Sequence, residues 1–104
     1  MKAEEAFEMG AKFLDDQDLD KALVAFSQAI RIDPKYAPAY NGRGVTYALM
    51  GQPERALADC GEAIRLDPKE PEFYRSRGYL YDSVGDEANA DADLAKADEL
   101  EAAP

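Results

Sequence analysis

The sequence predicts an all-α domain in which three helical hairpins, six helices in all, stack side by side over residues 1–104. Two observations predict this fold. The sequence repeats with a period of 34 residues, and each copy contains two helical segments separated by a break at glycine, proline or aspartate. A hairpin of this length cannot bury its apolar face alone, so neighbouring copies must bury it together. The copies are expected at about 3–36, 37–70 and 71–104.

The repeat is defined by columns of small and aromatic residues that recur in register. The columns are Gly10, Gly44 and Gly78; Phe13, Tyr47 and Tyr81; Ala22, Ala56 and Ala90; and Ala29, Ala63 and Ala97. Glycine and alanine at these positions let helix backbones approach closely, and aromatic side chains such as Phe26 fill the spaces between them. With so many columns in register, chance is a poor explanation of the similarity.

The second copy shows how each hairpin is built. Residues 40–50 form the first predicted helix, because apolar and small residues recur on one face. Gly51 ends that helix, and Pro53 opens the next one at a position where a missing N–H costs little. The pair Asp67–Pro68 ends the second helix, because the residue before a proline avoids the α conformation.

The first and third copies follow the same plan, but different residues begin and end their helices. In the first copy Asp18 is predicted to cap the second helix, since its carboxylate can accept a free N–H of the first turn. In the third copy Gly85 and Asp86 are predicted to act as stop and cap. We therefore expect the same helix pair three times.

This pattern resembles the tetratricopeptide repeat family, whose 34-residue motif runs Trp-x2-Leu-Gly-x2-Tyr, then Ala-x3-Phe, Ala and Pro. The second copy supplies these matching residues: Tyr40, Arg43, Gly44, Tyr47, Ala56, Cys60, Ala63 and Pro68. Cys60 and Leu94 replace the motif phenylalanine, and the third copy lacks the closing proline. The resemblance implies a right-handed superhelical solenoid, a concave face built from the first helix of each copy, protein–protein interaction, and no catalytic activity.

Within each copy, an arginine and an aspartate appear together or are absent together. Arg43 occurs with Asp59 and Arg77 with Asp93, whereas the first copy has Met9 and Ala25 at these positions. This covariation predicts two ion pairs, Arg43–Asp59 and Arg77–Asp93, each joining the two helices of one copy. The alternative is that these charges face the solvent independently.

The last helix is predicted to present a polar outer face. Its Asp91 and Asp98 replace the leucines and isoleucines that the earlier copies carry at the same positions, and they lie seven residues apart on one stripe. Terminal repeats of a solenoid need a polar outer face to remain soluble. We therefore expect the stack to end at this helix, and we expect no further copy to pack there.

The resemblance also implies which residues face the concave groove. The predicted binding residues are Phe7, Ala11, Leu14, Asn41, Val45, Ala48, Leu49, Arg75, Tyr79 and Asp82. Asn41 is suited to a peptide backbone and Arg75 to a carboxylate. The alternative for some of them, Leu49 above all, is packing against neighbouring helices. The co-chaperone type of groove, which clamps a chaperone's terminal carboxylate, is not expected, because this chain has Phe7, Ala11, Gly42, Glu72 and Ser76 where that clamp has Lys, Asn, Asn, Lys and Arg.

Composition narrows the function further. The net charge of −10 disfavours nucleic acid and anionic membranes, and it favours a basic or neutral protein or peptide partner. The sequence has no histidine and a single cysteine, Cys60, which we expect to be a buried inert thiol. Asp16, Asp18 and Asp20 resemble the start of a calcium loop but lack its later ligands. We therefore expect no enzyme activity, cofactor or metal.

The sequence predicts a non-catalytic adaptor that binds a partner peptide or protein in its groove. The alternatives are a homo-oligomeric scaffold, although a monomer is favoured, and a regulatory subunit of a larger complex. No segment is apolar enough to be a signal peptide or to enter a membrane, so a cytoplasmic location is expected. The partner itself is not identified by the sequence.

Overall fold

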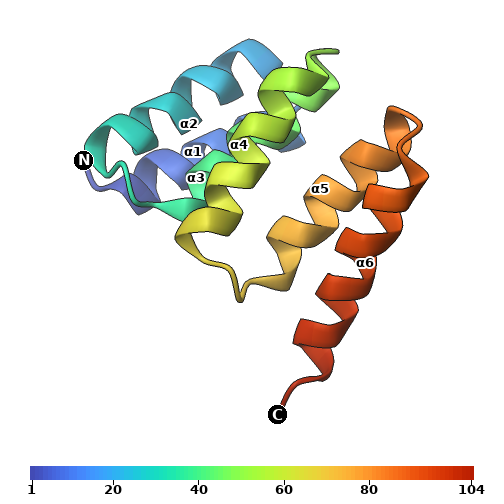
Figure 1. The fold of residues 1–104 in the computed structure, drawn as a ribbon. Helices are drawn as coiled ribbons and strands as arrows, with labels where there is room; N and C mark the ends of the chain where they lie inside the picture. The colour runs from blue at the N-terminus through green and yellow to red at the C-terminus, as the bar shows by residue number, and fades with distance from the viewer.

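The computed structural model describes all residues from 1 to 104, and it contains six α-helices and no strand. The helices are α1 (Ala3–Asp15), α2 (Leu19–Ile32), α3 (Ala37–Leu49), α4 (Pro53–Leu66), α5 (Pro71–Ser83) and α6 (Glu87–Ala102). Consecutive helices pair into three hairpins, which lie side by side from the blue to the red end of the chain (Figure 1). The all-α solenoid of three hairpins predicted from the sequence is confirmed.

The stack has an inner and an outer layer of helices. The first helices contact one another in succession, α1 with α3 and α3 with α5, whereas α2, α4 and α6 do not. The second helix of each hairpin instead packs against the first helix of the next hairpin, α2 on α3 and α4 on α5. In a curved stack, the layer whose helices lie closer to one another is on the inside of the curve. The helices α1, α3 and α5 therefore form the concave face.

The breaks between the two helices of each hairpin have one conformation in all three copies. Gln17, Gly51 and Gly85 lie 34 residues apart and have positive φ angles of 60°, 77° and 84°. Two of the three are glycine, which adopts this left-handed conformation without a steric penalty. The next residues include the predicted caps, and Asp18 and Asp86 each accept a backbone N–H of the first helical turn at 3.3 and 3.2 Å.

One helix boundary differs from the sequence prediction. The first helix of the second hairpin begins at Ala37, three residues before the predicted start at position 40. Pro38 therefore lies in its first turn, where no intrahelical hydrogen bond needs the missing N–H. The proline favours this early start.

The core consists of small residues that hold the helices close together. The two alanine columns of the second helices are at most 2% exposed in all three hairpins. The largest fully buried side chain is Phe26, which is 1% exposed and lies between α1 and α3. A Cβ atom at Gly10 would lie 2.7 Å from its ring, and one at Gly42 would lie 2.5 Å from it. The ring is therefore wedged between two glycines.

Two glycine-to-alanine substitutions are expected to change stability in opposite directions. Gly42→Ala should destabilise by up to about 2 kcal/mol, because overpacking of a core costs about 1–3 kcal/mol and outweighs a gain of about 1 kcal/mol in helix propensity. Gly61→Ala in α4 has no atom within 4 Å of its new methyl group and should stabilise by about 0.5–1 kcal/mol. Urea unfolding followed by circular dichroism measures both. A shift of the same sign in the two variants would contradict the packing around Phe26.

Both ion pairs predicted from the covariation are present. Arg43 donates from Nε and Nη2 to the two oxygens of Asp59 at 2.8 and 3.0 Å. Arg77 donates to Asp93 in the same way at 2.7 and 2.9 Å. Both aspartates are buried, at 7% and 6% exposure. The hydrogen bonds to these aspartates raise the pKa of Arg43 and of Arg77. The pairs therefore join the two helices of a hairpin.

The last hairpin differs from the other two at its outer face. Ile30 packs against the alanine core between the first two hairpins, and Ile64 packs against the cluster of Ala37, Ala63 and Phe73 between the second and third. The corresponding residue of α6 is Asp98, which is exposed, as is Asp91. This face of α6 therefore lacks the apolar contacts that hold the earlier hairpins together. None of the six helices has the length and apolarity needed to cross a lipid bilayer.

Candidate functional site

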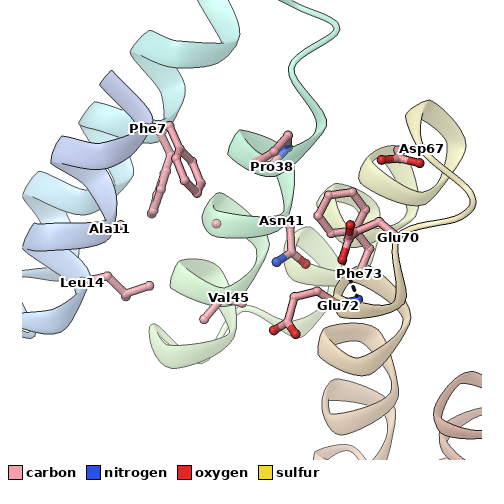
Figure 2. Close-up of a pocket in the computed structure, with 12 residues that line it drawn as sticks. Phe7, Ala11, Leu14, Pro38, Asn41, Val45, Asp67, Glu70, Glu72 and Phe73 are labelled. Atoms are coloured by element: carbon pink, nitrogen blue, oxygen red, sulfur yellow. Dashed lines mark hydrogen bonds between the residues drawn. The ribbon is translucent and has the colours of Figure 1, made fainter. Parts of the chain in front are cut away.

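A pocket of about 340 Å³ opens on the concave face between α1, α3 and the start of α5. Residues from α1 lie on one side of it, residues from α3 in the middle, and residues from the α4–α5 connection and α5 on the other side (Figure 2). We call it the acidic pocket. It is lined by Phe7, Ala11, Leu14, Phe26, Pro38, Asn41, Gly42, Val45, Asp67, Glu70, Glu72 and Phe73.

One side of the acidic pocket is apolar. Phe7 packs against Phe26 with ring centroids 5.7 Å apart, and against Tyr36 at 5.8 Å. These contacts fix the orientation of the Phe7 ring, which lies at the edge of the pocket (Figure 2). The apolar side is therefore a rigid aromatic wall.

The opposite side carries three carboxylates. Asp67 accepts the backbone N–H of Lys69 at 3.4 Å, and Glu70 accepts that of Glu72 at 3.3 Å, the bond drawn dashed in Figure 2. These bonds hold the acids at the entry to α5. No lysine or arginine is among the residues that line the pocket, so its field is negative.

Asn41 lies between the two sides, and its amide is incompletely paired. The atom Oδ1 is buried and accepts no hydrogen bond. A buried acceptor without a donor costs about 1–3 kcal/mol. Asn41 is therefore a polar group of the pocket that the protein leaves unsatisfied.

Arg75 occupies a different environment from the one expected. Its guanidinium pairs with Glu72 at 3.4 Å and also with Glu101 of α6. The third hairpin lacks the closing Asp–Pro of the other two, so α6 continues to Ala102 and places Glu101 opposite α5. Arg75 therefore already has carboxylate partners within the chain, and its pairing with a ligand carboxylate stays a prediction.

A second pocket, also of about 340 Å³, lies between α3 and α5. We call it the apolar pocket. Its lining residues are Gly44, Val45, Ala48, Leu49, Cys60, Ser76, Tyr79, Leu80 and Ser83. It contains no charged residue, and its rim residues Leu49 and Tyr79 are 61% and 60% exposed. Val45 lines both pockets, so the two adjoin along the concave face.

The structure gathers eight of the ten predicted groove residues into the two pockets. The acidic pocket contains Phe7, Ala11, Leu14, Asn41 and Val45, and the apolar pocket contains Val45, Ala48, Leu49 and Tyr79. Leu49 is exposed, so the alternative that it packs against a neighbouring helix is wrong. Arg75 and Asp82 line neither pocket.

Several lining residues were not identified from the sequence as groove residues. Asp67 and Glu70 lie in the connection between hairpins, outside the first helices from which the groove residues were predicted. Phe26 and Cys60 come from the second helices and reach the groove through glycine gaps in the first helices. Phe26 and Cys60 are one repeat of 34 residues apart and occupy equivalent positions in the two pockets, so the repeat itself is the sequence signal that could have identified them.

Models of known families match along most of the chain. A model described as tetratricopeptide repeat matches residues 37–70, and another with the same description matches residues 71–104. A model described as TPR repeat matches residues 10–51. No curated protein sequence matches significantly.

Solved structures share the fold over nearly the whole chain. The TPR2B domain in the pHsp70 complex of yeast Sti1 is 30% identical with a TM-score of 0.92, covering 98% of this chain and 82% of that one. MamA is 28% identical with a TM-score of 0.86, and this chain covers 58% of its length. The first TPR of Spaghetti (RPAP3) is 24% identical with a TM-score of 0.90 over 96% of this chain and 79% of its own, which supports the fold alone. The chain belongs to the tetratricopeptide repeat family.

Proposed function

We propose that this chain is a non-catalytic interaction module that binds a peptide segment of a partner protein along the concave face. The observation that carries the proposal is the adjoining pair of pockets on α1, α3 and α5, one acidic and one apolar. Ligand sites are concave, mostly apolar, and carry a few polar groups that fix orientation. The yeast Sti1 domain of the same family is found in a complex with pHsp70, which supports a peptide or protein ligand here.

The charge of the groove favours a partner segment with a lysine or arginine. Asp67 and Glu70 of the acidic pocket form no ion pair, Glu72 is paired only with Arg75 outside the lining, and the whole chain carries a net charge of −10. A cationic side chain would be attracted over a distance of about one Debye length, roughly 8 Å at physiological salt. The amide of Asn41 adds hydrogen-bonding capacity for the peptide backbone.

The same charges disfavour an acidic chaperone tail. The Spaghetti domain is bound to the Hsp90 peptide SRMEEVD, which carries three acidic side chains. Here Glu72 lies where the carboxylate clamp has a lysine, and it lines the acidic pocket. A like charge in this position repels an acidic tail. We therefore propose a groove that differs from the clamp type in the sign of its charge.

Neutralising the acidic pocket is expected to weaken binding of a basic peptide about tenfold. The probe is a set of peptides selected on the wild-type chain from a random dodecapeptide phage library and then synthesised. In the variant Asp67→Asn/Glu70→Gln/Glu72→Gln the amides at positions 67 and 70 keep a carbonyl that can accept the local backbone N–H, and the one at position 72 keeps an acceptor for Arg75. Each exposed charge pair contributes about 0.5 kcal/mol, and three together correspond to about a factor of ten in Kd. Isothermal titration calorimetry at two salt concentrations measures the change.

A matched control changes the net charge equally but away from the groove. The variant Glu87→Gln/Asp91→Asn/Asp98→Asn removes three exposed acids of α6. It should change Kd less than twofold. An equal loss in both variants would indicate unspecific attraction to the acidic chain, and unchanged binding in the groove variant would reject the acidic pocket as the site.

A further inference from the structure

The residue that fills the space beneath the groove changes from one hairpin to the next. In the first hairpin this residue is Phe26, whose ring lies against Gly10 of its own hairpin and Gly42 of the next. The ring is 1% exposed and occupies the space between these two backbones. Any side chain at position 42 would collide with it, because a Cβ there would lie 2.5 Å from Cε1.

One repeat later, the same three positions are occupied by Cys60, Gly44 and Ser76. The Sγ of Cys60 already lies 2.8 Å from where a Cβ of Gly44 would stand, as the Phe26 ring does at Gly10. A thiol, however, is much smaller than a phenyl ring. The apolar pocket is lined by these three residues, so a ring at position 60 would take up part of its volume.

The exchange of Phe26 for Cys60 and the exchange of Gly42 for Ser76, from one repeat to the next, are coordinated. In the first space, the Phe26 ring leaves no room for a Cβ at position 42, which is glycine. The equivalent position one repeat later is Ser76, which has a Cβ, so Ser76 is compatible with a small residue at position 60 and not with a large one. The pair Phe26 with Gly42 places a phenyl ring in the lining of the acidic pocket, whereas the pair Cys60 with Ser76 places a thiol and a hydroxyl group at the corresponding positions of the apolar pocket. The apolar pocket is therefore specified by the sequence at two positions.

The surface of the apolar pocket suits an uncharged side chain. Cys60 is 1% exposed, and burial raises its pKa to about 12, so its thiol stays neutral at physiological pH. Val45 and Leu80 supply aliphatic walls. Exposed Leu49 and Tyr79 at the rim extend the apolar surface toward an incoming chain. A charged side chain would find no partner there.

We propose that the apolar pocket anchors an aliphatic or aromatic side chain of the same partner peptide whose basic residue lies in the acidic pocket. This inference rests on the proposed function and adds the second half of the recognition motif. Val45 lines both pockets, so they lie next to each other. The carboxylates of the acidic pocket therefore favour a positive charge on the peptide segment whose apolar side chain occupies the apolar pocket. The occupant is a segment with one apolar and one basic side chain a few residues apart.

The test introduces into the apolar pocket the residue pair that the first hairpin has at the equivalent positions. The variant Cys60→Phe/Ser76→Gly recreates the Phe26–Gly42 arrangement, so it should fold with an unchanged or higher melting temperature. It should bind the phage-selected peptides at least tenfold more weakly than the wild type. The control Gly61→Ala changes the same helix outside both pockets and should keep Kd within threefold. On the peptide side, replacing the selected apolar residue by glycine should cause a similar loss on the wild type, which keeps the test valid if the double variant does not fold.

The outcomes separate this inference from the function on which it rests. Selected peptides that share a basic residue and no apolar one, or that bind the folded double variant as tightly as the wild type, would overturn the anchor and leave peptide binding intact. Failure to select any peptide would contradict the proposed function and the anchor with it. Self-association of the wild type in sedimentation velocity that the double variant abolishes would overturn the peptide occupant in favour of a second copy of the chain.

Discussion

Replacing Arg43 by methionine is expected to lower the free energy of unfolding by about 3 kcal/mol. The substitution leaves the carboxylate of Asp59, which is 7% exposed, without its two charge-assisted hydrogen bonds. Removing one partner of a buried ion pair costs about 3–5 kcal/mol, and the lower end applies because the Arg43 side chain is 23% exposed. The loss is a large fraction of the roughly 5–15 kcal/mol that stabilises a domain of this size.

The first hairpin provides the compensating substitution. It has Met9 and Ala25 at the positions of the arginine and the aspartate, and its two helices pack without an ion pair. The double variant Arg43→Met/Asp59→Ala should therefore lie within about 1 kcal/mol of the wild type, because no unpaired charge remains buried.

Urea unfolding of the four proteins in this double-mutant cycle gives the coupling energy of the pair. We expect a coupling of about 2 kcal/mol or more. Simple addition of the two single effects would contradict the interpretation that the covarying arginine and aspartate stabilise the hairpin as a pair.

Replacing Phe26 by alanine is expected to lower the free energy of unfolding by about 3–5 kcal/mol, the largest effect of any single substitution considered. Phe26 is the largest fully buried side chain, and its ring is in contact range of the backbones of both α1 and α3. The two glycines beside it have no side chains with which to fill the cavity, so relaxation is limited. The variant should also lose peptide binding, since the ring lines the acidic pocket.

A neighbouring substitution serves as the control. Val24, on the same helix, is 66% exposed, and Val24→Ala should change stability by less than about 0.5 kcal/mol. Thermal unfolding by calorimetry and urea unfolding by circular dichroism measure both variants. A loss below about 1.5 kcal/mol for Phe26→Ala would mean that the hairpins are not packed around this ring.

The repeat made the fold predictable from the sequence. A side chain that recurs every 34 residues has the same neighbours in each copy, so the columns of glycine and alanine give the helix pairs and their packing together. Comparison between copies also gave the ion pairs, because Arg43 and Arg77 each occur with an aspartate and Met9 does not.

The groove was harder to predict, because its chemistry depends on where the copies differ. Arg75 was expected to face a ligand, but the longer α6 brings Glu101 within pairing distance of it. Asp67 and Glu70 come from a connection between hairpins, whose path the helical period does not fix. Cys60 was expected to be a core residue, and it is buried, but its small size also leaves the apolar pocket open.

The most direct test of the account is a titration of the ¹⁵N-labelled chain with a phage-selected peptide, followed by amide chemical shifts. Binding along the concave face predicts the largest shifts at residues of α1, α3 and α5 that line the two pockets, such as Asn41, Val45 and Tyr79. Shifts concentrated on the outward faces of α2, α4 and α6, with these residues unchanged, would contradict the assignment of the concave face as the binding site.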